Sequence, residues 1–163
     1  MSTTQNRDMS MDEFTIKDPY GIDCSRLKKL LASPGSFRLV FFKLPPAEIL
    51  HLKYAMRNCW DKHFGWCSVT ISEFIDDLIS AIHIGILPLC MEKYENPDIL
   101  VFDNLQHIAG KAATQEEFYK IIKRRIEQKK TTIIFSQTGL TEMRKEMSDE
   151  LLQLLSAEYS ESV

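Results

Sequence analysis

The feature that most constrains the fold is an uninterrupted apolar run, Ile99 to Phe102, that leads directly into Asp103 and Asn104. A strand that is apolar at every position is buried on both faces, as strands are in parallel sheets covered by helices. Ligands of open α/β folds bind at the carboxyl ends of such strands. The run therefore predicts a central parallel strand that delivers an acidic residue to the ligand-binding edge of a sheet.

The same alternation of strand and helix patterns recurs along the chain. Short runs rich in β-branched and aromatic residues predict strands, and each is followed by a helical pattern. The strands are expected at 38–42, 66–70, 98–103 and 131–136. A βα repeat of this kind predicts an α/β fold with a parallel sheet and helices on both of its faces.

The helices are recognised by apolar residues that recur with the helical period. After the second strand, a single apolar stripe is expected from Phe74, Ile75, Leu78, Ile79 and Ile82. After the third strand, Thr114 and Glu117 have the spacing of a capping box. The sheet-facing residues of that helix are expected to be Phe118, Ile121, Ile122 and Ile126. A last helix is expected over 141–155, with Met143, Met147, Leu151, Leu154 and Leu155 on its apolar side.

Composition limits the size and the location of the protein. With 163 residues, 44% of them hydrophobic and 26% charged, the chain can bury the core of one ordinary domain. We expect that core over 11–157, a disordered tail at 1–10 and a short tail at 158–163. A net charge of −3 gives no global attraction to nucleic acid. The polar N-terminus and the short apolar runs predict a soluble, cytoplasmic protein without membrane contact.

The cysteines predict neither a disulfide framework nor a metal site. Cys24, Cys59, Cys67 and Cys90 are scattered without a CxxC pair, which suits a reducing compartment. Cys59, His63 and Cys67 are regularly spaced, but no fourth ligand is apparent. We therefore expect ordinary packed cysteines.

One long stretch resembles a known family. Residues 93–119, KYENPDILVFDNLQHIAGKAATQEEFY, resemble the Walker B strand, the following loop and the next helix of the bacterial replication initiator DnaA and its Hda-like relatives. VTISEF at 69–74 resembles the second strand of that family, and MDEF at 11–14 resembles the box that precedes its core. The resemblance covers about Phe14 to Leu155. It implies a three-layer AAA+ core, related to P-loop NTPases, with strand order 2-3-4-1 and without the family's lid or helix-turn-helix domain.

The phosphate-binding loop departs from the family pattern. In the family this loop reads GxxxxGKS or GxxxxGKT, and its backbone N–H groups and lysine hold the phosphates. In register with it, Lys43–Leu50 reads KLPPAEIL. Lys43 and Glu48 replace both glycines, so the backbone loses the freedom to wrap a phosphate. Pro45 and Pro46 have no N–H to donate. We therefore expect no nucleotide cofactor.

The other catalytic positions of the family are altered as well. The lysine position is Ile49 and the magnesium hydroxyl position is Leu50. Asp103 keeps the Walker B carboxylate, whereas Asn104 replaces the second acid with an amide that cannot act as a general base. Ser136 occupies the place of sensor one.

The helix near the end, SDELLQLL at 148–155, resembles the family segment that carries arginines, including the finger that acts on a neighbouring subunit. Glu150, Leu152 and Leu154 stand in those places, and none of them can stabilise a phosphate. The resemblance therefore implies a pseudo-ATPase rather than an enzyme. The simpler interpretation of Asp103 and Asn104 is that they end a strand and bond nearby backbone groups.

Two segments are candidates for contacts with other molecules. A basic cluster lies on the helix after the third strand and could contact DNA or an acidic partner, or could simply be the wet face of an amphipathic helix. It consists of Lys120, Lys123, Arg124, Arg125, Lys129 and Lys130. The second segment, IGILPLCM, is apolar, and its Pro88 is expected to interrupt any helix. Its large apolar residues, which the domain covers or a partner does, are Ile84, Ile86, Leu87, Leu89 and Met91.

Three functions are compatible with these residues. The resemblance favours a catalytically inactive DnaA-like domain that contacts a replication initiator, helicase or loader protein in replication initiation or its regulation. The alternatives are a nucleotide-dependent switch or ATPase of the DnaA, Hda or helicase-loader type, and a DNA-binding accessory protein that uses the helix at 120–130.

Overall fold

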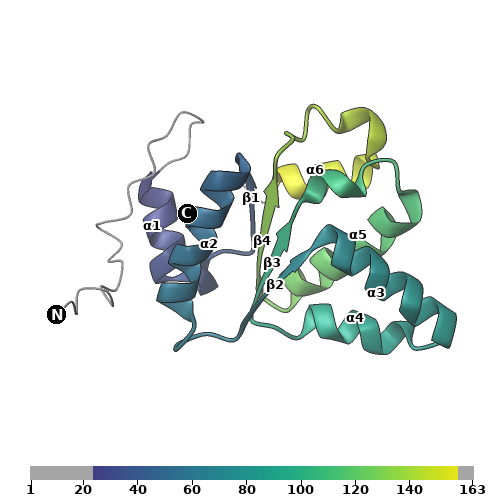
Figure 1. The fold of residues 1–163 in the computed structure, drawn as a ribbon, viewed down its shortest axis with the longest axis horizontal. Coiled ribbons are helices and arrows are strands. Elements are labelled where there is room, and N and C mark those ends of the chain that lie inside the picture. The colour runs from purple at the N-terminus through teal and green to yellow at the C-terminus, as the bar shows by residue number, and fades with distance from the viewer. Residues whose placement is uncertain (1–23, 158–163) are drawn as a thin grey trace.

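The computed structural model describes residues 24–157 and shows a parallel sheet between two layers of helices (Figure 1). The predicted tails at 1–10 and 158–163 and the MDEF segment lie outside these residues. The strands are β1 (Leu39–Lys43), β2 (Trp66–Thr70), β3 (Ile99–Asp103) and β4 (Thr131–Ser136). All pairings are parallel and the strand order is β1-β4-β3-β2. The predicted α/β class and the order 2-3-4-1 are confirmed.

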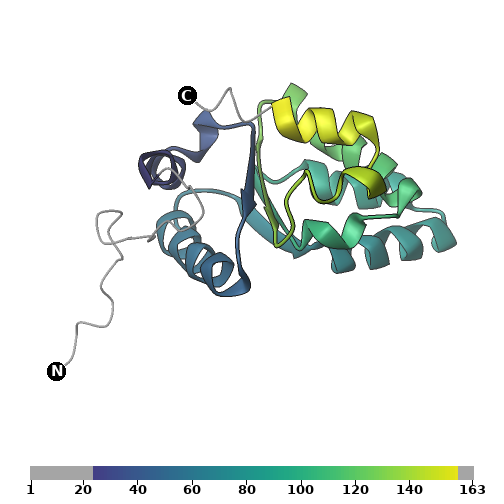
Figure 2. The ribbon, with the colours of Figure 1, turned by 90° about the horizontal axis from the view of Figure 1, so that it is seen from above.

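The helices divide between the two faces of the sheet, as Figure 2 shows from above. One face is covered by α1 (Cys24–Ala32) and α2 (Pro46–Trp60). The other is covered by α3 (Ile71–Ile84), α4 (Leu87–Glu95), α5 (Ala112–Glu127) and α6 (Asp149–Ala157). Short 3-10 turns connect these elements at Pro34–Ser36 (η2), Leu105–Ile108 (η3) and Arg144–Glu146 (η4). Each face has its own hydrophobic core.

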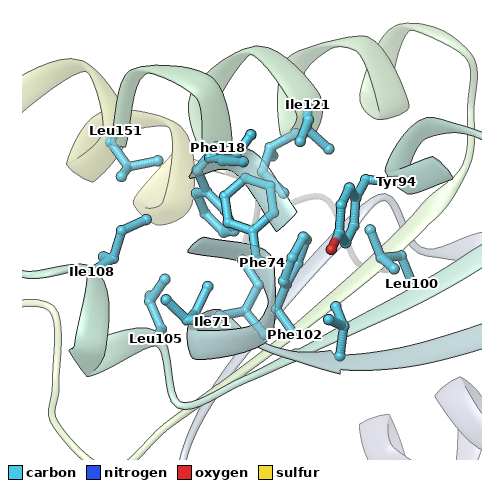
Figure 3. Close-up of a cluster of buried hydrophobic side chains, with 14 of the residues drawn as sticks. Ile71, Phe74, Tyr94, Leu100, Phe102, Leu105, Ile108, Phe118, Ile121 and Leu151 are labelled. Carbon is cyan, nitrogen blue, oxygen red and sulfur yellow. The ribbon is translucent and has the colours of Figure 1, made fainter. Parts of the chain in front are cut away.

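Aromatic side chains organise the core under α3, α4 and α5 (Figure 3). The rings of Phe102 on β3 and Phe118 on α5 lie 4.9 Å apart, and those of Phe74 and Tyr94 lie 5.0 Å apart. Edge-to-face pairs of this kind add roughly 0.5–1.5 kcal/mol each beyond the area they bury. The sheet-facing assignment of Phe118 and of the three isoleucines of α5 is confirmed, because all four pack in this core.

The capping box lies on a different helix from the predicted one. The capping box lies at the start of α3, where Thr70 Oγ1 accepts from Glu73 N and Glu73 Oε2 accepts from Thr70 N, both at 3.1 Å. The box predicted at Thr114 and Glu117 is wrong, since α5 begins at Ala112 and Thr114 already lies within its first turn. Thr70 ends a strand in extended geometry, as an N-cap requires.

The residues after β4 form a short turn and a helix rather than one long helix. A single helix over 141–155 is wrong, because the backbone is extended at Met147 (φ −125°, ψ 148°) between η4 and α6. The Ser148 hydroxyl accepts a hydrogen bond from Leu151 N and thereby starts a new helix. Met143 and Met147 are both buried, but they lie on either side of η4 and not in one helix.

The start of α4 and the apolar stripe of α3 differ from the predictions. Pro88 does not interrupt a helix; it lies in the first turn of α4, where a missing N–H costs no helical hydrogen bond. The predicted stripe of α3 is wrong in part, because Ile79 and Ile82 are 55% and 60% exposed. Phe74 and Leu78 of that stripe are buried.

Candidate functional site

The site is built around Asp103, the last residue of β3. Lys53 on α2 reaches over the carboxyl edge of the sheet and places its Nζ 2.7 Å from Asp103 Oδ2. The side chains are 24% and 13% exposed, respectively, so the pair is largely shielded from water. Asp103 Oδ1 accepts a hydrogen bond from the backbone N–H of Asn104 at 2.9 Å. Both carboxylate oxygens therefore have partners within the protein.

The loop between β1 and α2 is too short to enclose a phosphate. It consists of Leu44 and Pro45, and α2 begins immediately with Pro46. Leu44 N donates to Ser136 O at 2.9 Å, and the N–H groups of Glu48 and Ile49 both donate to Pro45 O at 3.1 Å. A phosphate cradle needs several N–H groups that converge on one point. Pro45 and Pro46 have no N–H group, and the N–H groups of Leu44, Glu48 and Ile49 all bond within the protein.

The side chains of residues 43–50 point in divergent directions. Ile49, where the resemblance places the family's lysine, is buried in the core between α2 and the sheet. Leu50, where the resemblance places the magnesium hydroxyl, is 71% exposed. Lys43 forms an exposed ion pair of 2.5 Å with Glu142. The hydrogen bond from Lys43, together with one from Gly139 N, holds the pKa of the Glu142 carboxyl below its usual value.

A network of amides joins the ends of β3 and β4. Asn104 adopts the left-handed backbone region (φ 61°, ψ 48°), which Asn tolerates better than most residues. Its Oδ1 accepts from the side-chain amides of Gln106 at 3.2 Å and Gln137 at 3.4 Å. Ser136 is fully buried, and its hydroxyl donates to Thr138 O at 2.6 Å. Asp103 and Asn104 thus end a strand and bond nearby backbone and side chains, as the simpler interpretation predicts.

The hollow at this edge is small. It has a volume of about 280 Å³ and is lined by Pro46, Ile49, Leu50, Lys53, Asp103, Asn104 and Gln137. Small-molecule sites occupy roughly 300–1,000 Å³, so this hollow lies just below their lower limit. A larger depression, of about 540 Å³, lies at the starts of α5 and α6. Its buried Gln115 is already bonded to Ile108 O, Glu146 O and Ser148 N.

The three positions where the resemblance places arginines lie on α6. Glu150 is exposed, whereas Leu152 and Leu154 are half-buried and pack against the core. These two leucines help to hold α6 on the sheet, which accounts for their apolar character. The arrangement offers no cation to a neighbouring molecule at these positions.

The predicted helix at 120–130 is too long, because α5 ends at Glu127 and Lys129 and Lys130 lie beyond it. One residue of the basic cluster is not on the surface. Arg125 is fully buried and donates to Thr132 Oγ1, to Pro97 O and to Thr131 O at 2.7–2.8 Å. Burial lowers the pKa of Arg125 to about 10. The assignment of Arg125 to a DNA- or partner-binding face is therefore wrong, since its guanidinium connects α5 to the starts of β3 and β4.

The remaining basic residues are partly neutralised. Arg124 forms an ion pair with Glu95 at 2.8 Å, and Lys120 pairs with Glu117 at 3.2 Å. Two of the three others also have partners: Lys123 lies 5.8 Å from the Tyr119 ring, and Lys130 donates to backbone oxygens. Lys129 is exposed.

The apolar segment at 84–91 divides into two sets. Met91 is buried and Leu87 packs partly against the core, so the domain covers these two. Ile84, Ile86 and Leu89 are 68%, 39% and 63% exposed. Within residues 24–157, no group of three or more His, Cys, Asp or Glu side chains is placed to hold a metal ion. None of the helices described here combines the length and the apolar character needed to span a bilayer.

Several residues of the site are not evident from the sequence. Lys53 is the most important of them. A carboxylate that is shielded from water needs a cation beside it. Lys53 is the only lysine or arginine in the first three turns of α2, and this is the one indirect sign in the sequence that it pairs with Asp103. Lys43 is expected in the altered loop, but its partner Glu142 lies 99 residues away in the sequence. Gln106 lies in the short turn η3 and Gln137 in the loop after β4, and no periodic pattern in the sequence describes the geometry of either segment.

The fold and the sequence were compared with those of known proteins. DnaA of Aquifex aeolicus with bound AMPPCP superimposes with a TM-score of 0.78 at 20% identity, covering 91% of this chain and 47% of that chain. Domain III of Thermotoga maritima DnaA gives 0.78 at 21% identity, covering 92% and 64%. A DnaA structure with AMPPCP and single-stranded DNA gives 0.80 at 20% identity, covering 94% and 49%. These similarities establish the fold.

Sequence comparison finds chromosomal replication initiator proteins DnaA. That of a Thermus thermophilus strain is 34% identical over 89 residues, which are 53% of this chain and 20% of that protein. That of Thermodesulfovibrio yellowstonii is 33% identical over 70 residues, 43% of this chain and 16% of that protein. These matches thus span about a fifth of the relatives' length or less. The sequence model of the bacterial DnaA ATPase domain matches residues 51–158, more than half of the chain. The chain therefore belongs to the bacterial DnaA ATPase-domain family.

Proposed function

We propose that this chain is a catalytically inactive DnaA-type AAA+ domain that acts through protein contacts in replication initiation or its regulation. The observation that carries the proposal is the ion pair between Lys53 and Asp103, at 2.7 Å. In P-loop NTPases the corresponding aspartate holds the magnesium ion of the nucleotide. A lysine ammonium paired with that carboxylate competes with a metal ion for it.

The altered loop supports the same proposal. The short connection through Leu44 and Pro45 presents no set of converging N–H groups, and Ile49 is turned into the core. The family match begins at His51, directly after these residues. The loop therefore lies outside the matched residues, together with α1 and β1, which is compatible with a loop that differs from the family pattern.

The DNA-binding alternative has less support. A DnaA structure contains bound single-stranded DNA, which makes DNA binding an alternative for this chain. However, the side chain of Arg125 on α5 is buried in the core and does not reach the surface. Arg124 and Lys120 are paired with glutamates, which reduces the positive potential of the helix. Binding driven by Lys123 and Lys129 would be weak and strongly salt-dependent.

The proposal is tested by purifying the tagged protein together with its partners from its native cells. One purification is untreated, one includes nuclease, and one is made after ATP has been depleted. We expect a replication initiator, helicase or loader that survives both treatments. A replication partner lost with nuclease would support the DNA-binding alternative. A partner lost only with ATP depletion would support the nucleotide-dependent switch, and a set without replication proteins would contradict the proposal.

A further inference from the structure

We draw no further inference here: the strongest candidate, the apolar groove between α3 and α4 where Ile84, Ile86 and Leu89 are exposed, carries none because the charged side chains that line it, Asp77 and Lys93, pair with each other and nothing in the described structure shows what covers it.

Discussion

Two residues decide the chemistry at the carboxyl edge of the sheet. Asp103 ends β3, and Lys53 on α2 is its counter-charge. A shielded carboxylate that lost this cation would be left partly desolvated, which is costly. At the residue scale the site is therefore a structural ion pair, and removal of one partner is expected to matter more than removal of both.

The first prediction tests this ion pair. Lys53→Met is expected to lower the free energy of unfolding by about 1–3 kcal/mol, because Asp103 remains without its cation. Lys53→Met combined with Asp103→Asn is expected to recover at least half of that loss. Urea denaturation measures both, with the exposed Lys62→Met as control. A loss below about 0.5 kcal/mol for Lys53→Met would show that the pair behaves like an ordinary surface pair.

The second prediction concerns Arg125. Arg125→Met leaves the carbonyl oxygens of Pro97 and Thr131 without their donor, and it is expected to cost about 3 kcal/mol or more in unfolding free energy. Lys123→Met, on the exposed side of the same helix, is expected to stay within about 0.5 kcal/mol. If chemical denaturation gives similar values for both variants, the buried guanidinium does not connect α5 to the sheet.

At the scale of elements, strands are easier to predict than helix ends. β2 and β4 have the predicted bounds, β3 begins one residue later than predicted, and β1 is shifted by one residue at both ends. The strands are located well because short β-branched and aromatic runs mark them in the sequence. The helix over 141–155 is wrong because Met143 and Met147 are four residues apart and both buried, which mimics a helical period. Local capping by Ser148 overrides that pattern.

The third prediction tests the cap of α3. Thr70→Ala removes the acceptor for Glu73 N and is expected to cost about 1 kcal/mol of unfolding free energy. Thr114→Ala is the matched control, because the sequence favours a cap there and the structure places that residue inside α5. Equal losses in the two variants, measured by thermal or urea unfolding, would contradict the observed helix starts.

The fourth prediction concerns the pH dependence of the contact between α3 and α4. Burial, and then the Asp77 carboxylate, raise the pKa of Tyr94 far above its usual value. Burial raises the pKa of Asp77, but hydrogen bonds from Lys93 and Tyr94 outweigh this and leave it lowered. The Tyr94 contribution is therefore complete below the unfolded tyrosine pKa of about 10 and is lost as the pH rises above it. The Asp77 contribution is complete above about pH 4 and is lost as the pH falls.

The corresponding variant is Tyr94→Phe. At pH 7 it is expected to lower the free energy of unfolding by about 1–3 kcal/mol, because a hydrogen bond to a charged group is removed. The difference from the unmodified protein is expected to shrink above about pH 10, where the unfolded tyrosine ionises. Urea unfolding at several pH values measures this, and a difference that does not change with pH would refute the assignment.

At the scale of the whole molecule, the chain has the fold of the DnaA ATPase domain, and we propose that its nucleotide site is inactive. The class, the strand order and the family could be predicted, because buried strands and the stretch at 93–119 are encoded locally. The prediction that the loop at Lys43–Leu50 holds no nucleotide rests on single residues such as Pro45 and Pro46 and stays a prediction. Neither the role of Lys53 nor the burial of Arg125 could be predicted, because both depend on contacts between segments that lie far apart in the sequence.

The central claim is that the nucleotide site is inactive. It is tested most directly by an equilibrium titration of the full chain with AMPPCP and Mg²⁺, in which calorimetry measures the binding. The DnaA of Aquifex aeolicus, whose structure contains AMPPCP, serves as the positive control. We expect no saturable binding up to about 1 mM for this chain and none for Lys53→Met. Binding of AMPPCP with a Kd below about 100 μM that Asp103→Asn abolishes would contradict the account.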